Sequence, residues 1–141
     1  MSGGRTAIVV DIPAALWKTS NGPHEHWRAA AGRRARLKRI GWATAMSWRR
    51  LRANAGLPDR FDRCELTIAI QYPPRAGRAD PANTADIAKP IIDGFTRAGL
   101  WADDDSRHIT TTSFTRSDTA APPGLHRLEF HIHPTDTKDE P

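Results

Sequence analysis

Four short segments of the chain have the residue pattern of β-strands. The clearest is residues 64–72, CELTIAIQY, in which Leu66, Ile68 and Ile70 alternate with mostly polar residues and would share the buried face of a half-exposed strand. Three further runs, rich in β-branched residues or alternating in polarity, predict the other strands: residues 6–12, 107–115 and 126–133. The pattern therefore predicts a small sheet of about four strands.

A long segment with helical periodicity follows the first strand and a polar loop, at about residues 25–54. Its apolar residues recur at intervals of three or four, and arginines occupy the other sides. Gly56 and Pro58 end it, and Gly32 and Gly41 are candidate points for a bend. This part of the chain predicts one long basic helix.

A second, shorter helix is predicted after the strand at 64–72. Pro90 lacks a backbone donor and disfavours the α conformation at Lys89, so the regular helix is expected to begin near residue 90. Gly99 suits the position after its last turn. One face of this helix is apolar and predicts burial in the core: Ile87, Ile91, Phe95 and Ala98.

The predicted elements come in the order strand, long helix, strand, helix, strand, strand, without an internal repeat or a long linker. This order indicates an α+β domain with a small mixed sheet, in which the second helix carries Lys89. The chain has 141 residues, and a domain of this size buries about two thirds of its unfolded surface in one core. We therefore expect a single domain at residues 1–134 and a disordered tail at 135–141.

Charge is distributed unevenly along the chain. It has 21 Lys and Arg against 16 Asp and Glu, which gives a net charge of +5 and a pI near 10.1. No acid lies between His26 and Pro58, so the arginines there lack helical i,i+4 partners and favour contact with nucleic-acid phosphates over a merely solvated face. The candidate DNA-binding residues are Arg28, Arg33, Arg34, Arg36, Lys38, Arg39 and Arg78.

Several classes of protein are disfavoured by composition. The single cysteine, Cys64, excludes an internal disulfide and a thiolate zinc cluster, and it is expected to be a buried thiol in a strand. No segment reaches the roughly 20 apolar residues of a membrane span, and the first residues do not resemble a signal peptide. We expect a soluble, cytoplasmic protein that does not contact a membrane.

Six acids gather around one lysine, Lys89, in the segment 78–108 of this basic chain. They are Asp80, Asp86, Asp93, Asp103, Asp104 and Asp105. Asp80 follows one predicted strand and the three consecutive aspartates precede another, so their carboxylates would meet across the helix if those strands are neighbours. Mg²⁺ prefers such oxygen ligands, and a nearby lysine can stabilise charge on a scissile phosphate. The alternative is a solvated helix followed by an acidic turn.

The order of residues in this segment also carries a family resemblance. The residues are Asp80, Asn83, Lys89, Asp93-Gly94-Phe95, Gly99-Leu100 and Asp103-Asp104-Asp105. Residues 19–39, TSNGPHEHWRAAAGRRARLKR, contain an Asn followed by His-Trp-Arg and a basic helix. Over residues 7–115 the chain resembles the RusA-like Holliday junction resolvases that are common in phages and prophages.

The resemblance implies a homodimeric endonuclease that binds four-way DNA junctions and makes paired, symmetric nicks. It implies Mg²⁺ as the cofactor, with Mn²⁺ as the alternative metal. Carried over residue by residue, it makes Asp80 and Asp104 the catalytic metal ligands, with Asp103 beside Asp104, and Lys89 the required lysine. The alternative that residue chemistry leaves open is a non-catalytic basic protein that binds or shapes DNA.

One departure from the family pattern concerns the first aspartate. Relatives have two aspartates, one residue apart, just before the Asn, whereas this chain has Asp80 followed by Pro81 and Ala82. Either Asp80 serves alone, or Asp86 or Asp93 supplies the second carboxylate. The run of three aspartates leaves the matching pair open between residues 103/104 and 104/105, and the separation from Lys89 favours Asp104.

Overall fold

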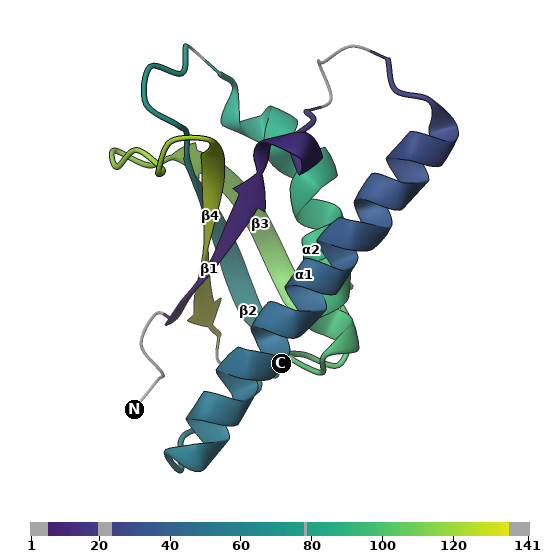
Figure 1. Cartoon of the computed structure of the whole chain (residues 1–141). Coiled ribbons are helices and arrows are strands. Elements are labelled where there is room, and N and C mark those ends of the chain that lie inside the picture. Colours follow the sequence, from purple (N-terminus) through teal and green to yellow (C-terminus); the bar gives the residue numbers. More distant parts are fainter. Residues whose placement is uncertain (1–5, 20–23, 78, 136–141) are drawn as a thin grey trace.

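The computed structural model describes residues 6–19, 24–77 and 79–135, in which four strands form one mixed sheet (Figure 1). The strands are β1 (Thr6–Pro13), β2 (Cys64–Gln71), β3 (Ile109–Arg116) and β4 (Leu125–Pro134). The helices are α1 (Trp27–Asn54) and α2 (Ala85–Arg97), with short 3₁₀ helices η1 (Ala14–Leu16) and η2 (Pro81–Thr84). The predicted α+β class, with a small mixed sheet and a long and a short helix, is confirmed.

The strand order across the sheet is β1-β4-β2-β3. β4 is antiparallel to both β1 and β2, whereas β2 and β3 are parallel and are connected through α2. Parallel neighbours start at the same end of a sheet, so the loop that leaves β2 and the loop that enters β3 lie at opposite ends. Figure 1 shows the first of these loops at the top and the second at the bottom.

The core lies on the face of the sheet that the two helices cover. Apolar residues at alternate positions of three strands are at most 2% exposed: Ile8, Val10, Ile12, Leu66, Ile68, Ile70, Leu128, Phe130 and Ile132. The predicted apolar face of α2 packs onto them, and Phe95 meets Phe130 edge-on with 4.9 Å between ring centroids. Cys64 is buried, as expected, and burial raises the pKa of its thiol to about 12.

The two helices cross at glycines, which lets their backbones touch. A Cβ atom on Gly94 would lie 2.1 Å from the carbonyl oxygen of Lys38 and 2.6 Å from the backbone nitrogen of Trp42. A Cβ atom on Gly41 would lie 2.3 Å from the carbonyl oxygen of Ile91. α1 runs through Gly41 as one helix, so this glycine serves the crossing with α2 and does not interrupt the helix.

α2 begins five residues earlier than the proline suggested. It starts at Ala85 and contains Pro90, whose ring is buried. The missing donor removes one hydrogen bond, to the carbonyl of Asp86, close to a helix start where other amides also lack partners. The 3₁₀ helix η2 feeds directly into α2, so the chain is already wound before Pro90.

One hydrogen bond lies just past the predicted domain boundary. The backbone N–H of Thr135 donates to the carbonyl oxygen of Arg63 at 2.9 Å, so the pairing of β4 with the segment before β2 continues to Thr135. The rest of the predicted tail, residues 136–141, lies outside the described residues, as does Arg78. None of the described helices has an apolar stretch of the length that crossing a bilayer requires.

Candidate active site

Lys89 lies between two carboxylates that come from different parts of the chain. Its Nζ atom is 3.6 Å from Oδ1 of Asp93, one turn further along α2, and 3.9 Å from Oδ2 of Asp104, in the loop that enters β3. The Lys89 side chain is 74% exposed, whereas that of Asp104 is 27% exposed. A solvent-accessible ammonium group is therefore held beside two acids that are partly shielded from water.

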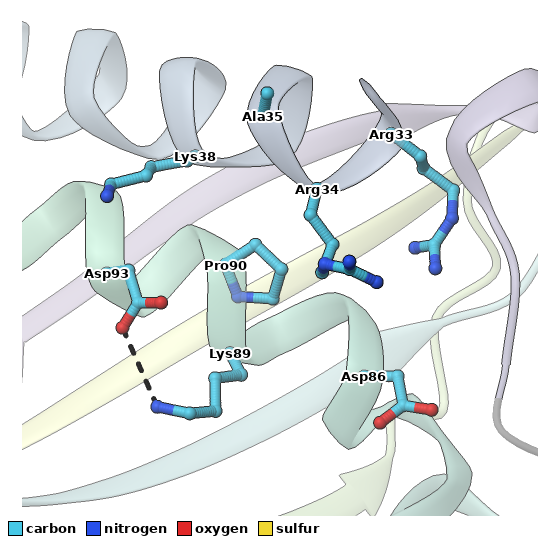
Figure 2. Close-up of a pocket in the computed structure, with 8 residues that line it drawn as sticks. All are labelled: Arg33, Arg34, Ala35, Lys38, Asp86, Lys89, Pro90 and Asp93. Atoms are coloured by element: carbon cyan, nitrogen blue, oxygen red, sulfur yellow. Dashed lines mark ion pairs between the residues drawn. The ribbon is translucent and has the colours of Figure 1, made fainter. Parts of the chain in front are cut away.

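A groove between α1 and α2 runs past this lysine. It has a volume of about 460 Å³, and α1 contributes Arg34 and Lys38 to its wall while α2 contributes Asp86, Lys89 and Asp93. Figure 2 shows the side chains of Arg34 and Lys38 extending from α1 toward α2, and that of Lys89 reaching toward Asp93. Both acids that could replace a missing family aspartate thus line the groove, and Asp93 is the one that pairs with Lys89.

The three consecutive aspartates, Asp103, Asp104 and Asp105, make different contacts. Oδ1 of Asp103 accepts a hydrogen bond from the backbone N–H of Asp104 at 2.7 Å, which shapes the turn. Asp105 accepts hydrogen bonds from Arg107 and pairs with His108, and these contacts lower its carboxyl pKa to about 2. Asp104 is thus the member that approaches Lys89, as the sequence separation suggested.

Asp80 lies at the other end of α2, away from this group. Its side chain accepts a hydrogen bond from the backbone N–H of Ala82 at 3.1 Å and so caps η2. The sequence argument joined Asp80 to Asp104 on the premise that the strands beside them are neighbours. The strands are neighbours, but they are parallel, and this places the end of β2 and the start of β3 at opposite ends of the sheet. The premise holds, but the conclusion drawn from it does not follow, and none of the described contacts joins Asp80 to Asp104 or Lys89.

The basic residues of α1 also fall into two groups. Arg33 is 10% exposed at its side chain and pairs with both oxygens of Glu25, an acid just before the helix that i,i+4 spacing did not reveal. The guanidinium of Arg28 lies over the ring of its neighbour Trp27, at 5.2 Å from the centroid. Within the described residues no ion pair neutralises the remaining candidates on α1, which are Arg34, Arg36, Lys38 and Arg39.

The two carboxylates beside Lys89, those of Asp93 and Asp104, are enough protein ligands for a magnesium site. In the part of the chain that the structure describes, no three His, Cys, Asp or Glu side chains gather as a metal-holding group. Mg²⁺ nevertheless needs only one or two protein carboxylates, since water and phosphate oxygens complete its shell. Asp93 and Asp104 are such a pair of oxygen donors, and each lies within 4 Å of the Lys89 ammonium, so a metal ion would compete with Lys89 for them.

Comparison with models of known protein families finds no match, and a search of curated proteins finds no relative. The resemblance to RusA-like resolvases therefore stays a prediction from the order of residues in the sequence. What the structure adds is the spatial arrangement of Lys89 with Asp93 and Asp104, and the groove in which Lys89 and Asp93 face Arg34 and Lys38 of α1.

Proposed function

We propose that this protein is a Mg²⁺-dependent endonuclease that nicks branched DNA, with four-way junctions as its substrate. The observation that carries the proposal is the position of Lys89, within 4 Å of the carboxylates of Asp93 and Asp104 and on the wall of a groove that also holds Arg34 and Lys38. This combination offers acidic oxygens for a metal ion beside cations for phosphates.

Each part of the site has a role in this proposal. Arg34 and Lys38 bind phosphates of the strand that follows the groove, because the charges of these side chains are not neutralised by described acids. Asp93 and Asp104 would hold the metal ion, and a bound Mg²⁺ would supply a Lewis acid and a water molecule of lowered pKa. Lys89 stabilises the negative charge that builds on the scissile phosphate.

Paired nicking of a junction requires two such sites. One chain offers one group of Lys89, Asp93 and Asp104, and two-fold pairing of identical chains is the simplest way to present two sites to a two-fold symmetric junction. The proposed partners are therefore a second copy of this chain and the junction itself.

A cleavage assay on a synthetic four-way junction tests the proposal. Wild-type protein should nick two opposite strands with Mg²⁺ and none with EDTA. Asp104→Asn and Lys89→Ala should each lower the cleavage rate by about 100-fold or more while junction binding stays. Asp118→Asn is the matched control, because Asp118 is an exposed acid in the loop after β3, away from Lys89.

The second candidate is a DNA-binding protein without nuclease activity. The observation in its favour is that Lys89 already neutralises both nearby carboxylates, while Asp80 caps a 3₁₀ helix elsewhere. This candidate predicts tight junction binding, no nicks at any concentration of Mg²⁺ or Mn²⁺, and equal tolerance of Asp104→Asn and Asp118→Asn. Such an outcome would remove the nuclease proposal.

A further inference from the structure

A second groove begins at Lys89, between α2 and the edge strand β3. Its volume is about 280 Å³. Lys89 and Asp104 belong to its wall, and Thr112 adds a hydroxyl group. The rest of the wall is apolar, from α2 and from β3 and its flank: Ala85, Ala88, Ile92, Ile109 and Phe114. Lys89 therefore separates two grooves of different character, one lined by charges and one lined mainly by hydrocarbon and an aromatic ring.

We propose that the groove between α2 and β3 holds one unstacked nucleobase of the strand whose phosphate lies at Lys89. This inference rests on the proposed function, because it takes the polar groove as the path of the DNA backbone. A nucleotide has the same division, with a charged phosphate on one side and a flat base on the other. Enzymes that do chemistry on a base show that a protein pocket can hold a nucleobase taken out of the stack.

The groove offers the contacts that a base needs. Phe114 and Ile92 are only partly buried, so part of each side chain is accessible for packing against a base. The Thr112 hydroxyl and the Asp104 carboxylate can meet polar atoms on the edge of a base. β3 is also the last strand of the sheet, so half of its backbone N–H and C=O groups face away from β2.

Charge favours a nucleobase over a protein segment in this groove. An extended peptide or a second copy of the chain could also pair with the edge of β3. The groove, however, adjoins at Lys89 the groove that holds Arg34 and Lys38, and these two cations form no ion pair with a described acid, although Asp86 and Asp93 line the same groove. A DNA strand satisfies both grooves with a single ligand, whereas a peptide in the apolar groove leaves the cations unpaired.

The test measures binding of fluorescein-labelled four-way junctions in EDTA, so that cleavage plays no part. One nucleotide at a time near the crossover is replaced by an abasic site. For wild-type protein, one position should weaken binding by about tenfold, since a base stacked on an aromatic side chain contributes on that order. Phe114→Ala should weaken binding of the intact junction by a similar factor and then be insensitive to the abasic site at that position.

Two further variants guard against a folding defect. Phe114→Leu keeps an apolar side chain in the groove, so it should fold normally and retain only part of the sensitivity to the abasic site. Thr112→Val should lower affinity for the intact junction. Thr111→Val is its matched control, because Thr111 is the preceding residue of β3, is also exposed and is not part of the groove wall.

The inference fails if every abasic position weakens wild type and Phe114→Ala equally. It also fails if Phe114→Ala dissociates a dimer of the free protein in sedimentation, because the groove would then be covered by a second chain. Its failure is distinct from failure of the nuclease proposal. If the protein cleaves junctions but Phe114→Ala does not change the effect of any abasic site, the base-binding inference fails and the nuclease proposal stands. If Phe114→Ala changes the effect of one abasic site but the protein does not cleave, the nuclease proposal fails and the base-binding inference stands.

Discussion

The two ends of the sheet that α2 connects present aspartates in opposite chemical settings. At one end, Asp104 faces the exposed ammonium group of Lys89 across 3.9 Å, on the wall of the groove between α2 and β3. At the other end, Asp80 accepts a backbone hydrogen bond in a region of stacked rings, where Trp17 lies parallel to His126 at 3.7 Å between centroids. An aspartate that matches a motif can thus either face a cation beside a groove or cap a turn of helix, and only its surroundings distinguish the two.

The end of the sheet near Asp80, here called the aromatic end, is formed by the packed rings of Trp17, Tyr72 and His126. Tyr72 meets Trp17 and His126 edge-on, and the guanidinium of Arg116 lies over its ring at 4.6 Å from the centroid. Burial is the main reason why the pKa of Tyr72 is raised, and the negative charge of nearby Asp80 contributes in the same direction. These contacts join the ends of β1, β2, β3 and β4, so this end of the sheet stabilises the fold.

The largest effect is expected from breaking the close crossing of α1 and α2, the helix that connects the two ends of the sheet. Gly94→Ala would push a methyl group against the backbone of Lys38 and Trp42, and it should lower the free energy of unfolding by about 3 kcal/mol. Gly32→Ala is the control, because its Cβ would meet nothing within 4 Å, and it should raise stability by about 0.5–1 kcal/mol. Urea denaturation followed by circular dichroism measures both, and equal effects would contradict the close crossing.

The sequence predicted the elements well because their signals are local. Alternation gave β2 and β4 to within one residue at each end, and the apolar positions of α2 gave its buried face. The site was only half predicted, because the prediction used spacing along the chain and left out strand direction. The helix predicted between the two strands was the available signal, since a crossover through a helix joins parallel strands, and parallel pairing of β2 and β3 separates Asp80 from Asp104.

The pairing of Arg33 with Glu25 and the groove at Phe114 were missed for a related reason. Glu25 precedes the helix and reaches Arg33 across eight positions, which no helical spacing rule includes. Phe114 was assigned to a strand correctly, but the groove it lines depends on how α2 packs beside β3. Contacts between distant segments decide both features.

Replacing Asp93, which pairs with Lys89, and Asp80, which caps η2, by asparagine tests which aspartate serves catalysis. Asp93→Asn should lower the rate of junction cleavage by about 100-fold, because it removes a charge next to Lys89. Asp80→Asn should leave the rate close to wild type, since the asparagine oxygen can still accept the hydrogen bond from Ala82. Single-turnover cleavage measures both, and the reverse ranking would return Asp80 to the active site.

The aromatic end should respond to pH through His126. Burial lowers the pKa of His126 to about 4 from its ordinary value of 6.5, so the unfolded chain binds more protons between these values. The contribution of neutral His126 is therefore fully present above pH 6.5 and is lost as pH falls toward 4. The melting temperature should fall over this range in wild type and fall less in His126→Phe, which keeps a ring against Trp17. Identical pH profiles would show that His126 does not titrate with unfolding.

The smallest effect is expected on DNA binding, from replacing one of two cations that line the groove between α1 and α2, Lys38 or Arg33. Lys38 has no ion pair with a described acid, so Lys38→Ala should weaken junction binding a few-fold and reduce the slope of log Kd against log salt by about 1. Arg33→Ala should lower thermal stability instead, because Arg33 is nearly buried and paired with Glu25, and it should leave the salt slope unchanged. Fluorescence anisotropy across a series of KCl concentrations distinguishes the two. Equal slopes for both variants would mean that the phosphate backbone does not follow this groove past Lys38, and the path assigned to the DNA would have to change.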